Sequence, residues 1–463
     1  MKAYHSYNMF DGAVLVAQEG KIVYKGAFGL ANREWDIPNS ADTKFMIGSV
    51  SKPLTAMLTL IQVQKGLINL DRTVREYLPE FAEKPAGVAT IRQLLNHTSG
   101  MQNYDIIKDF FPRISRDHFE REEYIKVYID SVLAFTPGTK FNYSSWGYFT
   151  LGYLLEKITG KTYSQLMKED VYDKIGMSSS GSYYHTQIVN KRATGYDYSL
   201  GGYNSGDFRD QSNTMGTGDI YSTVEDLFKF HLAITNNSLL NKELTDAMLR
   251  PGMAPINYGY GWFNKDFKYN QSDSVAANFH LGMTDGFISF FLRIPSTNSV
   301  VIILCNSSPT DFFGITKSLI NVLYNKPVIV KNPAHKVMES MIADQGAKAA
   351  VEQYKKMKAD SANYYIDWIS MNFIAEQLVT LKRLEDARII SENNAQQFPD
   401  KDLVMVTMGN IYLKLDRKQD AILYYKKALA IYPNYQEAKN RLKELEGNNV
   451  TKLRPSRNKK LKD

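Results

Sequence analysis

Ser49 and Lys52 stand three residues apart in a stretch, residues 45–66, that reads FMIGSVSKPLTAMLTLIQVQKG. If a helix begins near Ser49, this spacing places both side chains on one face, one turn apart. A serine hydroxyl is a weak nucleophile until a base lies within hydrogen-bond reach. Lysine can be that base where burial and a helix N-terminus disfavour its charged form. The pair therefore predicts an activated serine nucleophile.

A structural role is the alternative for this pair, because S-x-x-K is a loose pattern that recurs at Ser456 and Lys459 in a basic tail. The surrounding sequence favours catalysis. The residues after Lys52 predict a helix that is apolar nearly all round and therefore buried. Its apolar residues are Leu54, Met57, Leu58, Leu60, Ile61 and Val63. A lysine at the start of a buried helix must find partners or lose its charge.

Two later stretches carry polar side chains beside apolar elements. Tyr143-Ser144-Ser145 follows a Pro-Gly turn and precedes an apolar helix, so Tyr143 can project from a loop into a cleft. His280 lies at the start of the first strand in the run FHLGMTDGFISFFLRIP, residues 279–295, whose alternation predicts antiparallel strands together with the following SVVIILC. A strand edge beside the Ser49 helix could lend a backbone N–H to an oxyanion. Taken singly, a core tyrosine and a structural histidine are the alternatives.

The elements that must position these residues are a hairpin, the central helix, further strands and short helices. Residues 12–29 form two alternating runs joined by Glu19-Gly20-Lys21, which is a hairpin signal. TIRQLLNHTSG, residues 90–100, predicts a short helix ended by Gly100. We interpret its His97 as structural, because polar residues at a helix end usually satisfy backbone groups.

Length and composition exclude several classes of protein. A chain of 463 residues with 44% hydrophobic residues can form two or three domains with packed cores. No apolar run reaches the ~18 residues of a membrane span, and no secretory leader precedes residue 10. The single cysteine, Cys305, rules out internal disulfides and is expected in the core.

The net charge of +7 is concentrated at the C-terminus. Residues 448–463 carry six basic residues and one acidic residue, 6 − 1 = +5, which leaves 7 − 5 = +2 for the rest of the chain. A nucleic-acid-binding surface is therefore not expected. We interpret residues 448–463 as a basic disordered tail.

A repeat marks the C-terminal part of the chain. Leu381, Arg383, Asp386, Ala387 and Pro399 recur 34 residues later as Leu415, Arg417, Asp420, Ala421 and Pro433. This is the tetratricopeptide period, and such repeats normally bind another protein. We therefore predict a hydrolase domain at 1–328, a linker at 329–336, an all-α repeat domain at 337–447 and the tail, with a protein partner at the repeats.

Residues 10 to about 325 resemble the serine β-lactamase and penicillin-binding-protein superfamily, especially its branch of class C β-lactamases, D-peptidases and esterases. Ser49-Val50-Ser51-Lys52 matches the S-x-x-K motif. Tyr143-Ser144-Ser145 stands where the family has Tyr-x-Asn, and His280-Leu281-Gly282 where it has Lys-Thr-Gly or His-x-Gly. LLNHTSG, FTPGTKFNYSSWGY, STVEDL and YGYGW also resemble segments of this branch.

The resemblance implies an α/β (α+β) domain of two lobes, one an antiparallel sheet and one helical. It also implies that Ser49 attacks a carbonyl, that Lys52 takes its proton, and that Tyr143, acidified by Lys52, returns a proton to the leaving group. The N–H groups of Ser49 and Met283 would hold the oxyanion.

The remaining family positions imply substrate contacts. Gly282 and Met283 belong to the oxyanion strand, and Ser145 to the substrate site. His280 would either tune Tyr143 or contact a substrate carboxylate. No cofactor is expected, and no metal, because no histidine pair has a ligand spacing such as H-E-x-x-H.

The implied activity is acyl-enzyme hydrolysis of an ester, a D-amino-acid peptide or a β-lactam. Ser145 lacks the amide of the family asparagine, which favours an esterase or peptidase over a proficient β-lactamase. The alternative is a non-catalytic peptide sensor whose repeats recruit a partner. The family implies a periplasmic or extracellular location, whereas the start of this chain shows no leader and leaves a cytoplasmic location open.

Overall fold

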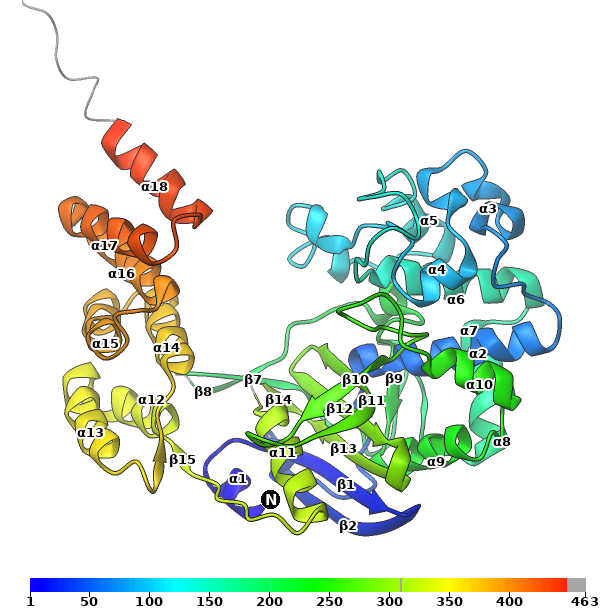
Figure 1. Ribbon diagram of the computed structural model, residues 1–463, viewed down its shortest axis with the longest axis horizontal. Coiled ribbons are helices and arrows are strands. Elements are labelled where there is room, and N and C mark those ends of the chain that lie inside the picture. Colours follow the sequence, from blue (N-terminus) through cyan, green and yellow to red (C-terminus); the bar gives the residue numbers. More distant parts are fainter. Residues whose placement is uncertain (201, 309, 448–463) are drawn as a thin grey trace, which may run out of the picture. The chain divides into compact units, whose positions relative to one another are not determined.

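The computed structural model describes residues 1–200, 202–308 and 310–447, so the basic tail interpreted as disordered lies outside the described residues. The chain forms two compact units. One contains the described residues of 1–198 and 203–329, and the other contains the described residues of 199–202 and 330–447 (Figure 1). Among the described residues, no helix is both long enough and apolar enough to cross a bilayer.

The first unit is built on an antiparallel sheet with the strand order β10-β11-β12-β13-β1-β2. Its strands are β1 (Gly12–Gln18), β2 (Lys21–Phe28), β10 (Phe263–Lys268), β11 (Ser274–Thr284), β12 (Phe287–Ile294) and β13 (Ser299–Cys305). The predicted hairpin at 12–29 and the predicted strands at 279–305 are confirmed. Glu19 and Gly20, with φ of +52° and +73°, make the tight turn between β1 and β2.

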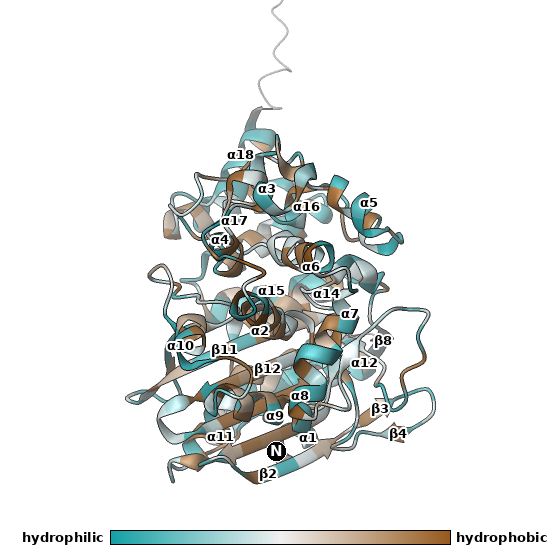
Figure 2. Ribbon diagram, turned by 90° about the vertical axis from the view of Figure 1, so that its right-hand side faces the viewer, coloured by the Kyte–Doolittle hydropathy of each residue, from teal (hydrophilic) through white to brown (hydrophobic). Residues whose placement is uncertain are grey.

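Helices cover both faces of this sheet. Alternate residues of β1 and β13, among them Leu15 and Ile302, face a core shared with α2 (Ser51–Gln64) and α9 (Val224–Thr235). The opposite face is covered by α11 (Phe312–Leu323), where the Phe312 ring lies 5.3 Å from that of Phe290 in β12. Figure 2 shows hydrophobic residues along the strands and along α2.

The helical lobe surrounds α2, whose residues from Ser51 to Gln62 are all buried, as the apolar pattern predicted. Its other helices are α3 (Val74–Tyr77), α4 (Ile91–Leu95), α5 (Arg121–Lys126), α6 (Ser145–Thr159), α7 (Tyr163–Leu166), α8 (Asp173–Ile175) and α10 (Lys242–Leu249). Ser144 caps α6 by accepting a hydrogen bond from Gly147 N, and Gly160 ends it in the left-handed region. This cap fixes the position of the backbone at Ser144, and therefore also that of Tyr143, the last loop residue before it.

Short elements complete the first unit. They are α1 (Lys2–Ser6), β3 (Leu30–Asn32), β4 (Ile37–Pro38), β5 (Phe45–Met46), β6 (Gly181–Ser182), β9 (Ile220–Ser222), β14 (Ser307–Ser308), and β7 (Tyr196–Ser199) and β8 (Gly202–Ser205) except for the end residues Ser199 and Gly202, which fall in the second unit. In the small sheet β5-β9-β6, Phe45 of β5 pairs with Ser222 of β9. This pairing holds the backbone just before the turn that contains Ser49.

The second unit is helical. Its elements are α12 (Ala334–Gln345), α13 (Ala347–Ala359), α14 (Trp368–Thr380), α15 (Leu384–Gln397), α16 (Asp402–Lys414), α17 (Lys418–Ile431) and α18 (Gln436–Gly447), with a short ladder of β15 (Asn332–Pro333) and β16 (Tyr364–Tyr365). The repeat recurs in detail: Arg383 pairs with Asp386, and Arg417 with Asp420, each at 2.8 Å. Both pairs sit at the start of the second helix of a helical hairpin.

Candidate active site

Ser49 lies in a 3₁₀ turn, η1 (Gly48–Val50), that runs directly into α2. Lys52 Nζ lies 3.0 Å from Ser49 Oγ, within hydrogen-bond distance. Ile47 N donates to Ile220 O at 2.9 Å and anchors the turn to β9. The Ser49 side chain is partly exposed, whereas Lys52 is fully buried. The hydroxyl is therefore accessible, and the amine is held behind it.

Burial changes the protonation of Lys52. It lowers the pKa of the amine from 10.5 to about 7, and the charge of Asp219 acts in the opposite direction. Nζ also donates to Thr217 O at 3.0 Å and lies 4.9 Å from the centre of the Tyr143 ring. A neutral amine donates to Thr217 O and can accept a hydrogen bond from Ser49 Oγ. This arrangement suits a base that takes the serine proton.

The turn at 214–219 supplies the Lys52 partner that sequence reasoning missed. Gly216 N donates to Asp219 Oδ1 at 2.8 Å, which closes the turn and presents Thr217 O to Lys52. Asp219 is buried, and burial raises its pKa to about 6. The only signal in the sequence was the glycine-bearing run GTGD.

Tyr143 lies beside Ser49 and Lys52, but its expected acidification is wrong. Burial raises the pKa of the Tyr143 phenol well above its usual value, and the hydrogen-bonding interaction with Ser49 opposes this only in part. The Lys52 amine is not among the groups that lower the pKa of Tyr143, and burial diminishes the charge of that amine. Tyr143 is therefore a protonated phenol, and burial makes it a weaker acid than an exposed tyrosine.

His97 holds the loop that carries Tyr143. Its Nδ1 accepts a hydrogen bond from Ser144 N at 3.2 Å, and its carbonyl accepts one from Asn142 N at 2.9 Å. The His97 and Tyr143 rings lie 4.3 Å apart between centroids. Burial lowers the pKa of His97, so the ring is neutral. These contacts agree with a structural role.

His280 is engaged within the protein through both ring nitrogens. Nδ1 lies 2.7 Å from Leu281 O, so it must carry a proton and donate it, and Nε2 then accepts from Tyr258 Oη at 2.9 Å. Burial lowers the pKa of His280 to about 3, which keeps the ring neutral. Its centroid lies 6.2 Å from that of Tyr143. In this geometry neither nitrogen is directed at a substrate carboxylate.

Gly282 and Met283 bring β11 against the Ser49 turn. A Cβ on Gly282 would lie 2.0 Å from Ile47 O, so only glycine permits this approach. A Cβ on Gly48 would lie 2.8 Å from Met283 N, which places that backbone nitrogen beside the turn. The backbones of Ser49 and Met283 are thus close, as an oxyanion hole built from the two would require.

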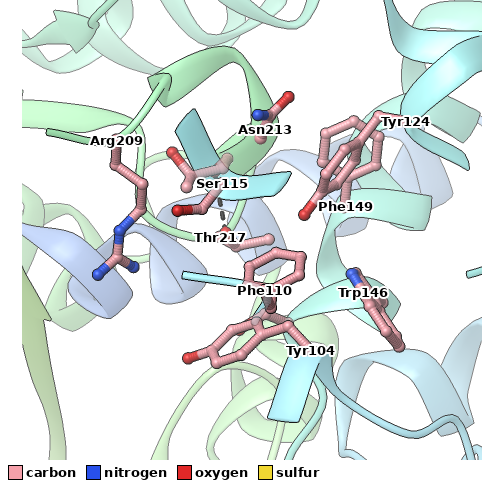
Figure 3. Close-up of a pocket in the computed structure, with 11 residues that line it drawn as sticks. Tyr104, Phe110, Ser115, Tyr124, Trp146, Phe149, Arg209, Asn213 and Thr217 are labelled. Atoms are coloured by element: carbon pink, nitrogen blue, oxygen red, sulfur yellow. Dashed lines mark hydrogen bonds between the residues drawn. The ribbon is translucent and has the colours of Figure 1, made fainter. Parts of the chain in front are cut away.

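Ser145, the first residue of α6, lines a cavity of about 30 Å³. Aromatic rings, including those of Tyr104 and Trp146, lie on one side of this cavity and Arg209 on the other (Figure 3). Ser145 N donates to Asn103 Oδ1 at 3.0 Å. Asn103 is a second residue that sequence reasoning missed: its side-chain amide oxygen lies beside the backbone nitrogen of Ser145.

Comparisons with known proteins agree with this architecture. The family model described as Beta-lactamase matches residues 2–323, and a tetratricopeptide repeat model matches residues 406–435. A penicillin-binding protein of Bacillus subtilis (strain 168) is 26% identical over 351 residues, covering 71% of this chain and 76% of that protein. A teichoic acid D-alanine hydrolase of Staphylococcus aureus (strain MRSA252) is 25% identical, covering 57% of this chain and 64% of that protein.

Solved structures give the same result. The crystal structure of a penicillin-binding protein from Bacillus halodurans superposes with a TM-score of 0.61 at 25% identity and covers 70% of this chain and 99% of that one. The two-lobed fold expected from the sequence is thereby confirmed. With its family model matched over residues 2–323 of 463, the chain belongs to the beta-lactamase family and carries a tetratricopeptide repeat in its C-terminal part.

Proposed function

We propose that this protein is a serine hydrolase that works through an acyl-enzyme on Ser49. The observation that carries the proposal is the buried Lys52 amine, with a pKa of about 7, placed 3.0 Å from the partly exposed Ser49 hydroxyl. An amine with that pKa is substantially neutral at neutral pH and can serve as a general base. Membership of the beta-lactamase family supports the same chemistry.

In the proposed acylation, Ser49 Oγ forms a bond to the substrate carbonyl carbon while its proton passes to Lys52 Nζ. The resulting ammonium is stabilised by Thr217 O and by the Tyr143 ring face. When the tetrahedral intermediate collapses, Tyr143 Oη gives its proton to the departing oxygen or nitrogen. The Lys52 ammonium then returns a proton to Tyr143, so the acyl-enzyme forms with both groups restored.

The carbonyl oxygen becomes negatively charged during this step. We place it between the backbone N–H groups of Ser49 and Met283, because β11 lies against the Ser49 turn at Gly48. Fixed backbone donors cost no reorganisation during the reaction, and losing one such donor typically slows turnover about 10²- to 10³-fold.

In the proposed deacylation, water attacks the acyl carbonyl and gives its proton to the neutral Lys52 amine. The proton returns to Ser49 Oγ as the ester bond breaks, and the acid product leaves. His280 takes no proton in this scheme, because its ring nitrogens are bonded to Leu281 O and Tyr258 Oη.

We propose esters and amides of D-amino acids as the substrate class, with β-lactams as poor substrates. One relative is named a teichoic acid D-alanine hydrolase, and another is named a penicillin-binding protein. Ser145 has a short hydroxyl where the resembling family has a side-chain amide. It can therefore form fewer hydrogen bonds with the side chain of a β-lactam. We further propose that the tetratricopeptide repeat binds a protein partner.

Covalent labelling tests the nucleophile. A fluorophosphonate should add one adduct to the intact mass, and peptide mapping should place it on Ser49. Ser49→Ala should take up no adduct, while Ser238→Ala, which changes an exposed serine, should label like the wild type. An adduct mapped to any other serine would reject the Ser49 assignment.

Turnover separates the hydrolase from the non-catalytic peptide sensor. The exposed Met283 side chain and the short Ser145 side chain are the features that favour a sensor. Wild-type protein should hydrolyse a p-nitrophenyl ester faster than Ser49→Ala does. Equal rates in the two proteins, at matched concentration, would favour the sensor.

A further inference from the structure

Three loop segments of the first unit bring His118, His185 and Asp210 together. His118 precedes α5, His185 follows β6, and Asp210 caps the short 3₁₀ helix η7 (Gln211–Thr214). The Nδ1 atoms of both histidines lie 3.2 Å from the same oxygen, Asp210 Oδ2. The histidines are 67 residues apart in the chain, so a search for closely spaced histidine pairs passes over them.

The distances fit a divalent metal ion. Zinc binds histidine nitrogen and carboxylate oxygen at about 2.0–2.2 Å, so neighbouring ligand atoms in a tetrahedral site lie about 3.3 Å apart. Both nitrogen–oxygen distances here are 3.2 Å, and the three ligand atoms all lie within 4.8 Å of one another. Small rotations of the exposed imidazoles would complete the geometry.

The surrounding groups orient the ligand atoms. Asp210 is buried, and its Oδ1 accepts hydrogen bonds from Ser212 N at 2.9 Å and Ser212 Oγ at 2.6 Å, which leaves Oδ2 to face the histidines. Glu120 Oε1 lies 3.6 Å from His118 Nε2. A carboxylate near the second nitrogen of a metal-binding histidine is a recurrent feature, because it fixes the ring orientation and raises the basicity of the ligand atom.

We propose that His118 Nδ1, His185 Nδ1 and Asp210 Oδ2 bind one Zn²⁺ or similar first-row transition-metal ion. Two imidazoles and one carboxylate suit Zn²⁺, whereas Mg²⁺ and Ca²⁺ prefer oxygen ligands. Three protein ligands leave at least one coordination position open. That position faces solvent, because the His118 and His185 side chains are 57% and 40% exposed.

The ion would tie together segments that line the cavity beside Ser145. Asp210 N donates to Ser115 O at 2.9 Å, and Asn213 Nδ2 donates to Asp117 O at 2.7 Å. Ser115 and Asn213 both line that cavity (Figure 3). A bound metal would therefore stabilise the loops that form the walls of this cavity.

Calorimetric titration of the metal-stripped full chain with Zn²⁺ tests the site. We expect one equivalent to bind and the temperature of unfolding to rise, because a ligand that binds only the folded state stabilises it. His118→Ala and His185→Ala should each weaken binding by more than the about 10- to 100-fold typical of losing an outer-shell partner. Co²⁺ should give visible d–d absorption in the wild type and lose it in both variants, while Mg²⁺ and Ca²⁺ should not compete.

His5→Ala is the matched control. His5 is similarly exposed, at 43%, and its Nδ1 lies 3.1 Å from the Asp11 carboxylate, but within the described part of the chain no second histidine joins that pair. Zinc affinity should be unchanged in this variant. The proposal is overturned if the wild type binds no more Zn²⁺ than the His118→Ala/His185→Ala double variant, or if His5→Ala loses as much affinity. Circular dichroism of each variant excludes unfolding as the cause.

Discussion

Replacing Lys52 with methionine should stabilise the protein and greatly slow its proposed activity. Burial lowers the pKa of the Lys52 amine from 10.5 to about 7. Each pKa unit corresponds to about 1.36 kcal/mol, so keeping the amine protonated in the folded state costs about 5 kcal/mol below pH 7. Methionine removes this cost, but it leaves Thr217 O without its Lys52 partner, at about 1–3 kcal/mol. We expect a net stabilisation of about 2–4 kcal/mol near pH 6.

The dependence on pH distinguishes this effect from ordinary repacking. Folded wild-type protein releases the Lys52 proton near pH 7, whereas the unfolded chain holds it up to about pH 10.5. Between these values the unfolded chain binds more protons, so wild-type stability rises with pH. The stability advantage of Lys52→Met should therefore be full below pH 7 and shrink as the pH approaches 10.

Urea denaturation of both proteins at several pH values measures the stability difference, with hydrolysis of a p-nitrophenyl ester measured in parallel. Lys52→Met and Lys52→Arg should each lose about 10²- to 10⁴-fold in kcat/KM. In the wild type, kcat/KM should rise with pH through an apparent value near 7, which belongs to Lys52 coupled to its neighbours. Lys65→Met is the control: this half-exposed lysine pairs with Asp170, and such pairs contribute only about 0–1 kcal/mol.

Two results would refute this reasoning. A Lys52→Met protein less stable than the wild type by the same amount at all pH values would show that Lys52 is charged and well paired when folded. Near-normal esterase activity of Lys52→Arg would reject Lys52 as the base, because a guanidinium does not deprotonate in this pH range.

Three further predictions follow from the site and the chain. Tyr143→Phe should slow amide hydrolysis about 10²- to 10⁴-fold but p-nitrophenyl ester hydrolysis much less, since that leaving group departs without a proton; steady-state rates on both substrates check this, and equal losses would contradict it. Gly282→Ala should lower the free energy of unfolding by about 1–3 kcal/mol and should also lower esterase activity, because the new methyl group would clash with Ile47 O. Urea denaturation measures the stability, and a free energy of unfolding equal to that of the wild type would show that β11 can move away from the Ser49 turn. A chain ending at Val328 should be soluble and cleave a small ester, while recruitment of a partner should fall; an insoluble or inactive product would show that the repeats complete the enzyme.

Much of the fold could be predicted from the sequence, because it depends on contacts between neighbouring residues. The three-residue spacing of Ser49 and Lys52 puts both side chains on one face whether the backbone is 3₁₀ or α-helical, and the Nζ–Oγ distance is 3.0 Å. Glu19-Gly20 predicted the β1–β2 turn because glycine tolerates positive φ. The 34-residue period predicted paired helices, since each repeat needs the same buried alanine and the same Arg–Asp pair.

The electrostatics of the site were decided only by the tertiary structure. Thr217 lies 165 residues from Lys52 in the chain, yet its carbonyl orients the amine. The pKa of Tyr143 depends on how much water the rest of the fold removes from its phenol, and so its direction was mispredicted. His118 and His185 meet only because separate loops converge on Asp210. Desolvation and long-range juxtaposition depend on atoms distant in the chain, and local sequence patterns carry no information about them.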